Sequence, residues 1–333
     1  MTQPAVTTGL FGSSPTVELA VGGDRLRIAL LGATPLSWLV DLPGGPADVL
    51  DGYQDDGELT AQDGVRNGLM APFCNRVADG RYTFDGRVHD LLPGAADRTI
   101  YHGLVRSQEF AVVATGHDED SAWVRLRCDA LAGGLVPGYP FAVAIEVTYR
   151  LAAGALAVEI VGVNVGATAA PFAADWHPYF RLPGPTTIDR LHLDLAAHVA
   201  IATDAELIPR SGPRAYRPLA GHCRWEPIGA AVVDGAFVGS PDETGTIRSV
   251  LRDPMTGVEL SVWQDRGLVH VFTGDTVARG RRASVAIEPV EVLTDAFNRP
   301  DCAATIRLEP GTRRSFRFGV DLRATTPQVV SKM

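Results

Sequence analysis

The chain has 333 residues, of which 46% are hydrophobic and 21% charged. This composition builds a sizeable packed core, fits one large or two ordinary domains and excludes bulk disorder. The net charge of −9 and the pI near 5.4 disfavour nucleic-acid binding, which needs clustered positive charge. The one lysine is Lys332, in the tail, so the chain offers no P-loop lysine, no Schiff-base lysine and no Ser–Lys dyad.

Predicted strands dominate the chain. Its 35 glycines and 23 prolines recur at short intervals and leave little room for long helices. Between them apolar and polar residues alternate, which is typical of antiparallel strands with one buried face. In chain order the alternating segments are residues 123–127, 145–149, 158–165, 191–195, 258–262 and 316–320. Residues 85–86 and 265–267 are expected to form hairpin turns.

No shift in composition indicates a linker, and no repeat or low-complexity tract occurs. We therefore expect a single antiparallel domain over residues 1–333, built as a sandwich or a barrel. Its core is expected over about residues 16–324, with loose termini at residues 1–15 and 325–333.

Cysteine usage and the amino terminus bear on the compartment. No two of the four cysteines stand at a Cys-x-x-Cys spacing; they are Cys74, Cys128, Cys223 and Cys302. This predicts free thiols in a reducing compartment. The chain opens without a charged region followed by an apolar run, and no apolar stretch reaches 18 residues. We expect a cytoplasmic protein with no signal peptide and no membrane span.

The common nucleotide and catalytic signatures are missing from the sequence. It contains no G-x-G-x-x-G after a strand, no P-loop, no G-x-S-x-G elbow and no H-E-x-x-H pair; each of these motifs would place a cofactor, nucleophile or metal. The eight histidines are scattered along the chain. We expect neither a metal nor a cofactor.

Four short segments set ionisable residues in apolar or glycine-rich surroundings: residues 71–80, 101–104, 175–182 and 284–289. Glu288 follows an apolar run and precedes a proline, which predicts a partly desolvated carboxylate at a strand end, with a raised pKa. His177 is flanked by aromatic residues, Tyr179 among them. Aromatic faces suit the apolar face of a sugar, and a histidine there can donate or accept a proton.

Each segment also has a structural interpretation. His177 fits a hydrogen-bonded core residue, and Arg76 fits a buried partner of an acid. His102 fits a turn residue before Gly103, and Glu288 fits a solvated strand end. Taken one by one, the residues predict an all-β protein with a candidate His/Glu proton-transfer pair.

Taken in order, five segments resemble the aldose 1-epimerase (galactose mutarotase) family. The most specific is His-Pro-Tyr-Phe-Arg-Leu at residues 177–182, which is similar to that family's His-Pro-Tyr-Phe-Asn-Leu. The others are Asn-Arg at 75–76 with a following hairpin at 80–86, His-Gly at 102–103, an Asp-bearing segment at 233–238, and a Glu segment at 286–289 followed by 295–300. The matches span about residues 66–300.

The resemblance implies an all-β fold, a large antiparallel β-sandwich of the galactose mutarotase type with the sugar in an open cleft. It implies a cofactor-independent isomerase that interconverts the α and β anomers of a free aldohexose, such as glucose or galactose. Glu288 is implied as the base at the anomeric hydroxyl, His177 as the acid at the ring oxygen, and His102 as a group that polarises that oxygen. The implied substrate-binding residues are Arg76, Asn75, Asp234 and Tyr179.

The sequence departs from the family pattern at three places expected near the pocket. Arg181 stands where Asn is usual, Trp176 precedes the histidine, and Leu104 follows Gly103 in place of a second glycine. These departures leave the physiological sugar open. A cation at Arg181 or Arg106 suits either an acidic or phosphorylated sugar or a surface ion pair, which is the more common role.

Two other functions fit the same residues. One is a non-catalytic sugar-binding or regulatory protein, although a binder needs no acid/base pair. The other is a carbohydrate lyase or hydrolase. A hydrolase needs two carboxylates ~5–10 Å apart on either side of the scissile bond, and Asp234 and Glu288 are the candidates. The expected partner is a small-molecule sugar, with no nucleic acid and no membrane, and the chain is expected to be a monomer or a homodimer.

Overall fold

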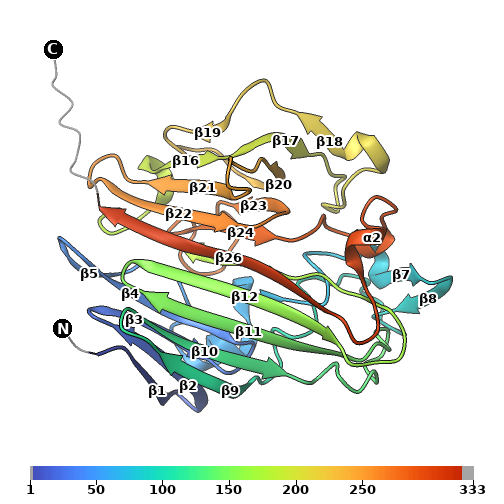
Figure 1. The fold of residues 1–333 in the computed structure, drawn as a ribbon. Coiled ribbons are helices and arrows are strands. Elements are labelled where there is room, and N and C mark those ends of the chain that lie inside the picture. Colours follow the sequence, from blue (N-terminus) through green and yellow to red (C-terminus); the bar gives the residue numbers. More distant parts are fainter. Residues whose placement is uncertain (1–2, 325–333) are drawn as a thin grey trace.

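The computed structural model describes residues 3–324, and strands are by far its most common regular element (Figure 1). All six segments that the alternation predicted as strands coincide with strands, apart from the end residues Val165 and Leu191. The helices are short: α1 (Asp56–Ala61) and α2 (Ala303–Ile306). None of the helices within residues 3–324 is long and apolar enough to cross a membrane.

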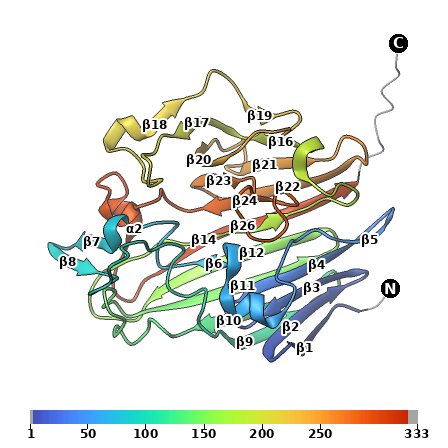
Figure 2. The ribbon, with the colours of Figure 1, turned by 180° about the vertical axis from the view of Figure 1, so that it is seen from behind.

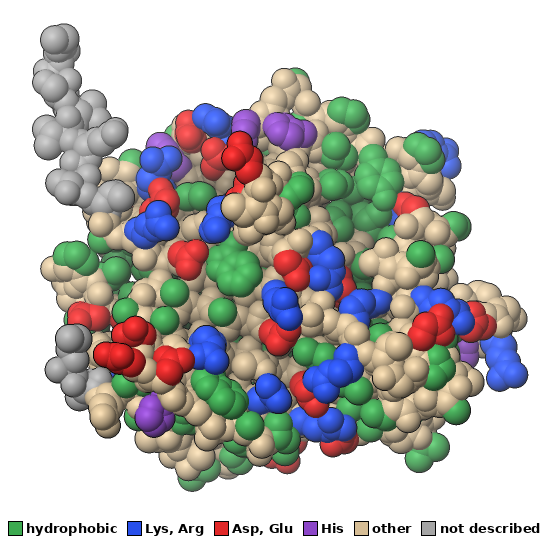
Figure 3. All heavy atoms as spheres, viewed as in Figure 1, with side chains coloured by type: hydrophobic (Ala, Val, Ile, Leu, Met, Phe, Trp, Pro, Cys, Tyr) green, Lys and Arg blue, Asp and Glu red, His purple; other side chains and the backbone are tan. Residues whose placement is uncertain are grey.

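A nine-stranded antiparallel sheet forms one layer of the molecule. In spatial order its strands are β19 (Cys223–Trp225), β16 (His192–Leu195), β21 (Ile247–Arg252), β22 (Val258–Gln264), β26 (Arg313–Ala324), β12 (Ala155–Asn164), β11 (Val143–Ala152), β10 (Ser121–Cys128) and β9 (Ala111–His117). Basic and acidic side chains are interspersed on its outer face (Figure 3). Cross-strand ion pairs occur there, for example Arg317 with Glu159 at 2.8 Å.

Two further sheets cover the inner face of this layer (Figures 1 and 2). An eight-stranded sheet runs β18 (Tyr216–Pro218), β17 (Ala197–Ile201), β20 (Asp234–Gly239), β23 (Leu268–Phe272), β24 (Val285–Val290), β14 (Asp175–Trp176) and β6 (Leu69–Met70), with β15 (Tyr179–Phe180) also paired to β24. A five-stranded sheet runs β1 (Ala5–Phe11), β2 (Ser14–Val21), β3 (Asp24–Ala29), β4 (Thr34–Leu42) and β5 (Gly45–Asp48). Two small two-stranded sheets complete the fold: a hairpin of β7 (Arg81–Phe84) and β8 (Arg87–Asp90), and a pair of distant short strands, β13 (Ala170–Pro171) and β25 (Arg307–Leu308).

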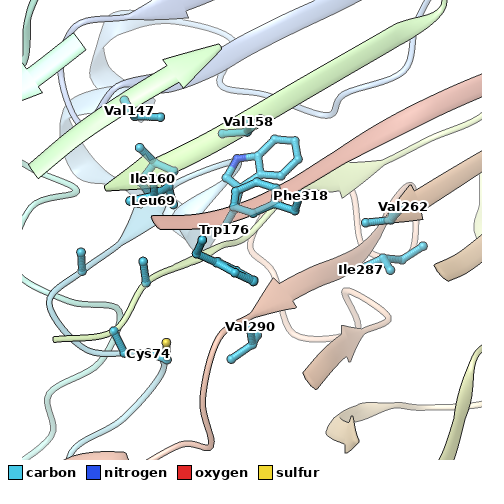
Figure 4. Packing of buried hydrophobic residues seen from close by; sticks show 14 of the residues in the cluster. Leu69, Cys74, Val147, Val158, Ile160, Trp176, Val262, Ile287, Val290 and Phe318 are labelled. Carbon is cyan, nitrogen blue, oxygen red and sulfur yellow. The ribbon is translucent and has the colours of Figure 1, made fainter. Parts of the chain in front are cut away.

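One cluster of buried side chains joins all three large sheets, and it includes Trp38 of β4, Trp176 of β14 and Phe318 of β26. The Trp176 ring stacks on Phe318 with 5.6 Å between centroids (Figure 4). Ile287 and Val290 of β24 also lie in this cluster. Burial of this apolar surface between sheets is the main force that holds the sandwich together.

One local prediction was wrong, and another was only half right. Ordered strands begin at Ala5, well before residue 16, because the first segment pairs with its neighbour along its whole length. Residues 85–86 do form the predicted hairpin turn between β7 and β8. Residues 265–267 form a turn but no hairpin, since β22 and β23 belong to different sheets. The predicted loose tail, residues 325–333, and Lys332 within it lie outside the described residues.

Candidate active site

A cavity of about 480 Å³ lies over the eight-stranded sheet, and all seven residues that the sequence predicted for the site line it. They are Asn75, Arg76, His102, His177, Tyr179, Asp234 and Glu288. Side chains alternate between the faces of a strand, so Ile287 enters the core while its neighbour Glu288 turns away from it. The site therefore occupies the face of the sheet that is opposite the core.

Glu288 and His177 are neighbours at the base of the cavity. The Nε2 atom of His177 lies 3.4 Å from Oε1 of Glu288, and both residues are buried. Burial raises the pKa of Glu288 to about 8 and lowers that of His177 to about 3, because each charged form loses its hydration. Glu288 is the fourth of six residues in β24, so it is buried within a strand and not at a strand end as predicted.

Backbone contacts with the segment around Asn67 hold His177 in place. The His177 N–H donates to Gly68 O at 3.0 Å, and the Asn67 N–H donates to His177 O at 2.9 Å. The buried side chain of Asn67 accepts from the Tyr179 N–H at 2.9 Å. The His-Pro-Tyr motif is thus held from both ends, which limits where its imidazole can point.

Two loops that are distant in sequence bring Arg76 and His102 to the same wall of the cavity. Arg76 forms an isolated antiparallel bridge with Tyr101, and the His102 N–H donates to Asn75 O at 2.6 Å. The guanidinium of Arg76 lies over the Tyr101 ring, 5.5 Å from its centroid. This pairing makes the Asn-Arg and His-Gly segments one structural unit.

His102 lies both in a turn and in the wall of the cavity, so its interpretation as a turn residue and its interpretation as a site residue are compatible. Its backbone has φ +64°, in the left-handed region, which is uncommon outside glycine. Gly103 follows with φ +69°, and a Cβ there would lie 2.4 Å from Ala71 O. The His102 ring lies 5.3 Å from the His177 ring. Burial, with the nearby His177, holds the pKa of His102 well below its usual range.

The aromatic residues of the third segment divide between the cavity and the core. Tyr179 stacks on His177 with 4.9 Å between centroids, and its hydroxyl donates to Gly64 O at 2.9 Å. Trp176 and Phe180 are fully buried in the core cluster. Trp176 was expected near the pocket, but strand alternation turns it away from the cavity, and its Nε1–H donates to Asn67 O at 2.9 Å.

His270 is a cavity residue that the sequence analysis did not single out. Its Nε2 lies 2.9 Å from Oδ1 of Asp234, and it stands opposite Glu288 in the pairing of β23 with β24. Burial disfavours the charge on His270, but Glu288 and Asp234 outweigh that effect and raise its pKa. Burial also acts to raise the pKa of Asp234, yet the hydrogen bond from His270 keeps it below the usual value.

The sequence did not decide whether Arg106 and Arg181 face the sugar or form surface ion pairs, and the structure gives them different surroundings. Arg106 lines the cavity. Arg181 does not: it forms an ion pair with Asp48 at 3.0 Å, and its Nε–H donates to Asp48 O at 3.0 Å. Arg181 thus has the surface ion-pair role.

The cysteines and the metal-ligating side chains do not form a site of their own within residues 3–324. All four cysteines are free and buried. In the part of the chain that the structure describes, no three His, Cys, Asp or Glu side chains are arranged to hold a metal ion.

The antiparallel sandwich has the fold of the galactose mutarotases. The crystal structure of galactose 1-epimerase from Lactobacillus acidophilus superposes with a TM-score of 0.80 over 98% of this chain and 100% of that one, at 15% identity. The family model described as aldose 1-epimerase matches residues 15–320. The chain belongs to the aldose 1-epimerase family.

Curated relatives are distant in sequence. The uncharacterized protein YihR of Escherichia coli K12 is 25% identical over 295 residues, which cover 87% of this chain and 88% of YihR. Galactose mutarotase of Rattus norvegicus is 27% identical over 217 residues, which cover 62% of this chain and 61% of the rat protein.

Proposed function

We propose that this protein is an aldose 1-epimerase that interconverts the α and β anomers of a free aldohexose by opening and reclosing the ring. The observation that carries the proposal is the buried pair of Glu288 and His177, 3.4 Å apart at the base of a cavity of about 480 Å³. Small-molecule sites measure roughly 300–1,000 Å³, so the cavity suits a monosaccharide.

Ring opening needs one proton removed from O1 and one delivered to O5. Both oxygens are bonded to C1, so the base and the acid must be neighbours, as Glu288 and His177 are. After rotation about C1–C2 the ring closes on the other face with the two roles reversed. The reaction has no redox step and no covalent intermediate. One positioned acid or base contributes ~10²–10⁴-fold to such a rate.

The pair holds one proton near neutral pH. With the pKa of Glu288 at about 8 and that of His177 at about 3, this proton rests on the carboxyl group in the empty site. Transfer of the proton to the imidazole gives a carboxylate beside an imidazolium, and we assign this arrangement to the reacting complex. Glu288 then takes the proton from O1 while His177 delivers one to O5.

The remaining residues bind and orient the sugar in this proposal. Arg76 and Asp234 bind hydroxyl groups, with Asn75 beside Arg76, and His102 polarises the ring oxygen. Tyr179 holds the imidazole of His177 by stacking on it. The ion pair of Asp234 with His270 keeps that carboxylate charged, and a charged carboxylate is a strong acceptor for sugar hydroxyls.

Two observations favour catalysis over the alternatives. A binding protein gains nothing from a fully buried carboxyl group, because its desolvation destabilises the fold whenever the group is charged. In a hydrolase, Asp234 and Glu288 would have to face each other across the scissile bond. His270 stands between these roles, because it is hydrogen-bonded to Asp234 and lies opposite Glu288 in the strand pairing.

Polarimetry on freshly dissolved α-glucose and α-galactose tests the proposal. We expect the protein to accelerate the approach to the equilibrium rotation while the total sugar stays constant. Binding without acceleration would instead support a binding protein, and new reducing ends from an oligosaccharide would support a hydrolase.

A further inference from the structure

Two arginines line the cavity, and neither is in an ion pair within residues 3–324. Arg76 at least contacts a ring, Tyr101, although its buried Nε has no hydrogen-bond partner. Arg106 has neither a carboxylate partner nor a stacked ring in the described part of the chain. A guanidinium with five N–H donors is therefore available to a ligand.

Comparison with Arg181 shows that this is no general property of the chain's arginines. Arg181 lies against Asp48, which takes two of its donors. Arg66, behind Tyr179, is paired with Asp51 at 2.6 Å. Arginines next to the site are thus neutralised by carboxylates, whereas Arg106 on the cavity wall is not.

The acidic groups of the cavity do not neutralise Arg106 either. The charge of Asp234 is balanced by His270 at 2.9 Å. Glu288 has a pKa raised to about 8 by burial, so it is mostly uncharged at neutral pH. Asp63 lines the cavity but is exposed and lies beyond ion-pair distance of Arg106. A partly buried cation facing this cavity therefore favours a ligand that brings its own negative charge.

We propose that the preferred substrate is an aldose that carries an anionic group, and that Arg106 binds this group. A carboxylate, a sulfate-type group and a phosphate all match a guanidinium, which can hold two of their oxygens at once. The inference rests on the proposed function, because it names the substrate class of that same site. Arg106 is a specificity residue in this proposal and takes no part in proton transfer.

Anomer exchange measured by NMR at equilibrium tests the inference without the need for a pure anomer. The substrates are glucose, glucuronic acid, glucose 6-sulfate and glucose 6-phosphate, which separate the three anionic groups from one another and from the neutral sugar. The proteins are the wild type, Arg106→Gln, Arg106→Lys and the matched control Arg181→Gln.

We expect kcat/KM of the wild type for at least one anionic sugar to exceed that for glucose by about tenfold or more, and to fall as salt is added. Arg106→Gln should lower the ratio of anionic to neutral kcat/KM by about 10- to 100-fold, since a charge-assisted hydrogen bond is lost. Arg106→Lys should restore part of the ratio, and Arg181→Gln should leave it unchanged.

Two results would overturn the inference while the proposed function stands: exchange of glucose faster than that of all three anionic sugars, or an Arg106→Gln variant with an unchanged ratio. Failure to accelerate exchange of any sugar, glucose included, would overturn the proposed function itself, and this inference with it.

Discussion

The Nε2 atom of His177 lies 3.4 Å from Oε1 of Glu288, and burial shifts the pKa values of these two side chains in opposite directions. The pair therefore holds one proton over a wide pH range. Below a pH of about 3 both groups carry a proton, and above a pH of about 8 neither does. In both limits the site lacks either its base or its acid.

This pairing predicts the pH profile of the reaction. We expect kcat/KM for anomer exchange to be nearly constant from about pH 5 to 7 and to fall about tenfold per pH unit above about pH 8, where the shared proton is lost. The profile can be measured by NMR exchange after subtraction of the buffer-catalysed rate. A rate that stays level through about pH 9 would show instead that Glu288 works as an ordinary ionised base, with no shared proton to lose.

The raised pKa of Glu288 also predicts a dependence of stability on pH. A carboxyl group with a folded-state pKa of about 8, against an ordinary value of 4.5, stabilises the folded state below pH 4.5, and this contribution is lost as the pH rises to 8. Glu288→Gln should thus gain stability relative to the wild type, by a few kcal/mol, between about pH 5 and pH 8.

Urea unfolding at the two pH values measures this difference. Glu159→Gln, on the outer face of β12, is the matched control and should follow the wild type, because Glu159 is only half-buried. If the wild type and Glu288→Gln show parallel changes in unfolding free energy, Glu288 has no raised pKa.

Removal of the charge on His270 is expected to change the pH above which kcat/KM falls. Its charge lowers the pKa of Glu288 and counteracts part of the effect of burial. His270→Gln keeps a donor for Asp234 but removes the charge, so the fall in kcat/KM should move to higher pH by about one unit, the equivalent of ~1.4 kcal/mol. His222→Gln, at an exposed ion pair with Asp194, serves as the control. A limit that stays in place or moves to lower pH would remove His270 from this role.

Gly103 predicts a combined loss of stability and activity. Its φ is +69°, and a Cβ at this position would lie only 2.4 Å from Ala71 O. The site leaves no room for a side chain, so Gly103→Ala should destabilise the fold by about 2 kcal/mol or more. The shift should also displace His102 and lower kcat/KM.

A substitution at Gly86 is the control that separates the cost of backbone strain from the cost of a steric clash. Gly86 has φ +76°, but no other atom lies where its Cβ would be. Gly86→Ala should therefore cost about 1 kcal/mol and leave full activity. Equal losses in thermal denaturation for Gly86→Ala and Gly103→Ala would contradict the close-approach argument.

Much of the fold could be predicted because strand alternation is a local pattern. Residues 145–149 and 316–320 alternate as β11 and β26 do, but nothing in them indicates that β12 lies between those strands. Sheet order depends on contacts between distant segments. For the same reason the turn at 265–267 was visible, while its passage from one sheet to another was not.

The site shows the same division. The seven predicted residues came from motifs, and the cavity unites them. His270 was missed because a single histidine in an apolar strand resembles many others, and only its register opposite Glu288 marks it. Arg106 and Arg181 looked alike in the sequence, since the carboxylate that separates them, Asp48, comes from a distant strand.

The most direct test of the proposed mechanism is the rate of anomer exchange in Glu288→Gln and His177→Asn, each shown to be folded by circular dichroism. Both substitutions keep the shape of the side chain and remove its ability to transfer a proton near neutral pH. We predict that each lowers kcat at least ~100-fold. Near-normal exchange in either variant would contradict the assignment of the acid/base pair.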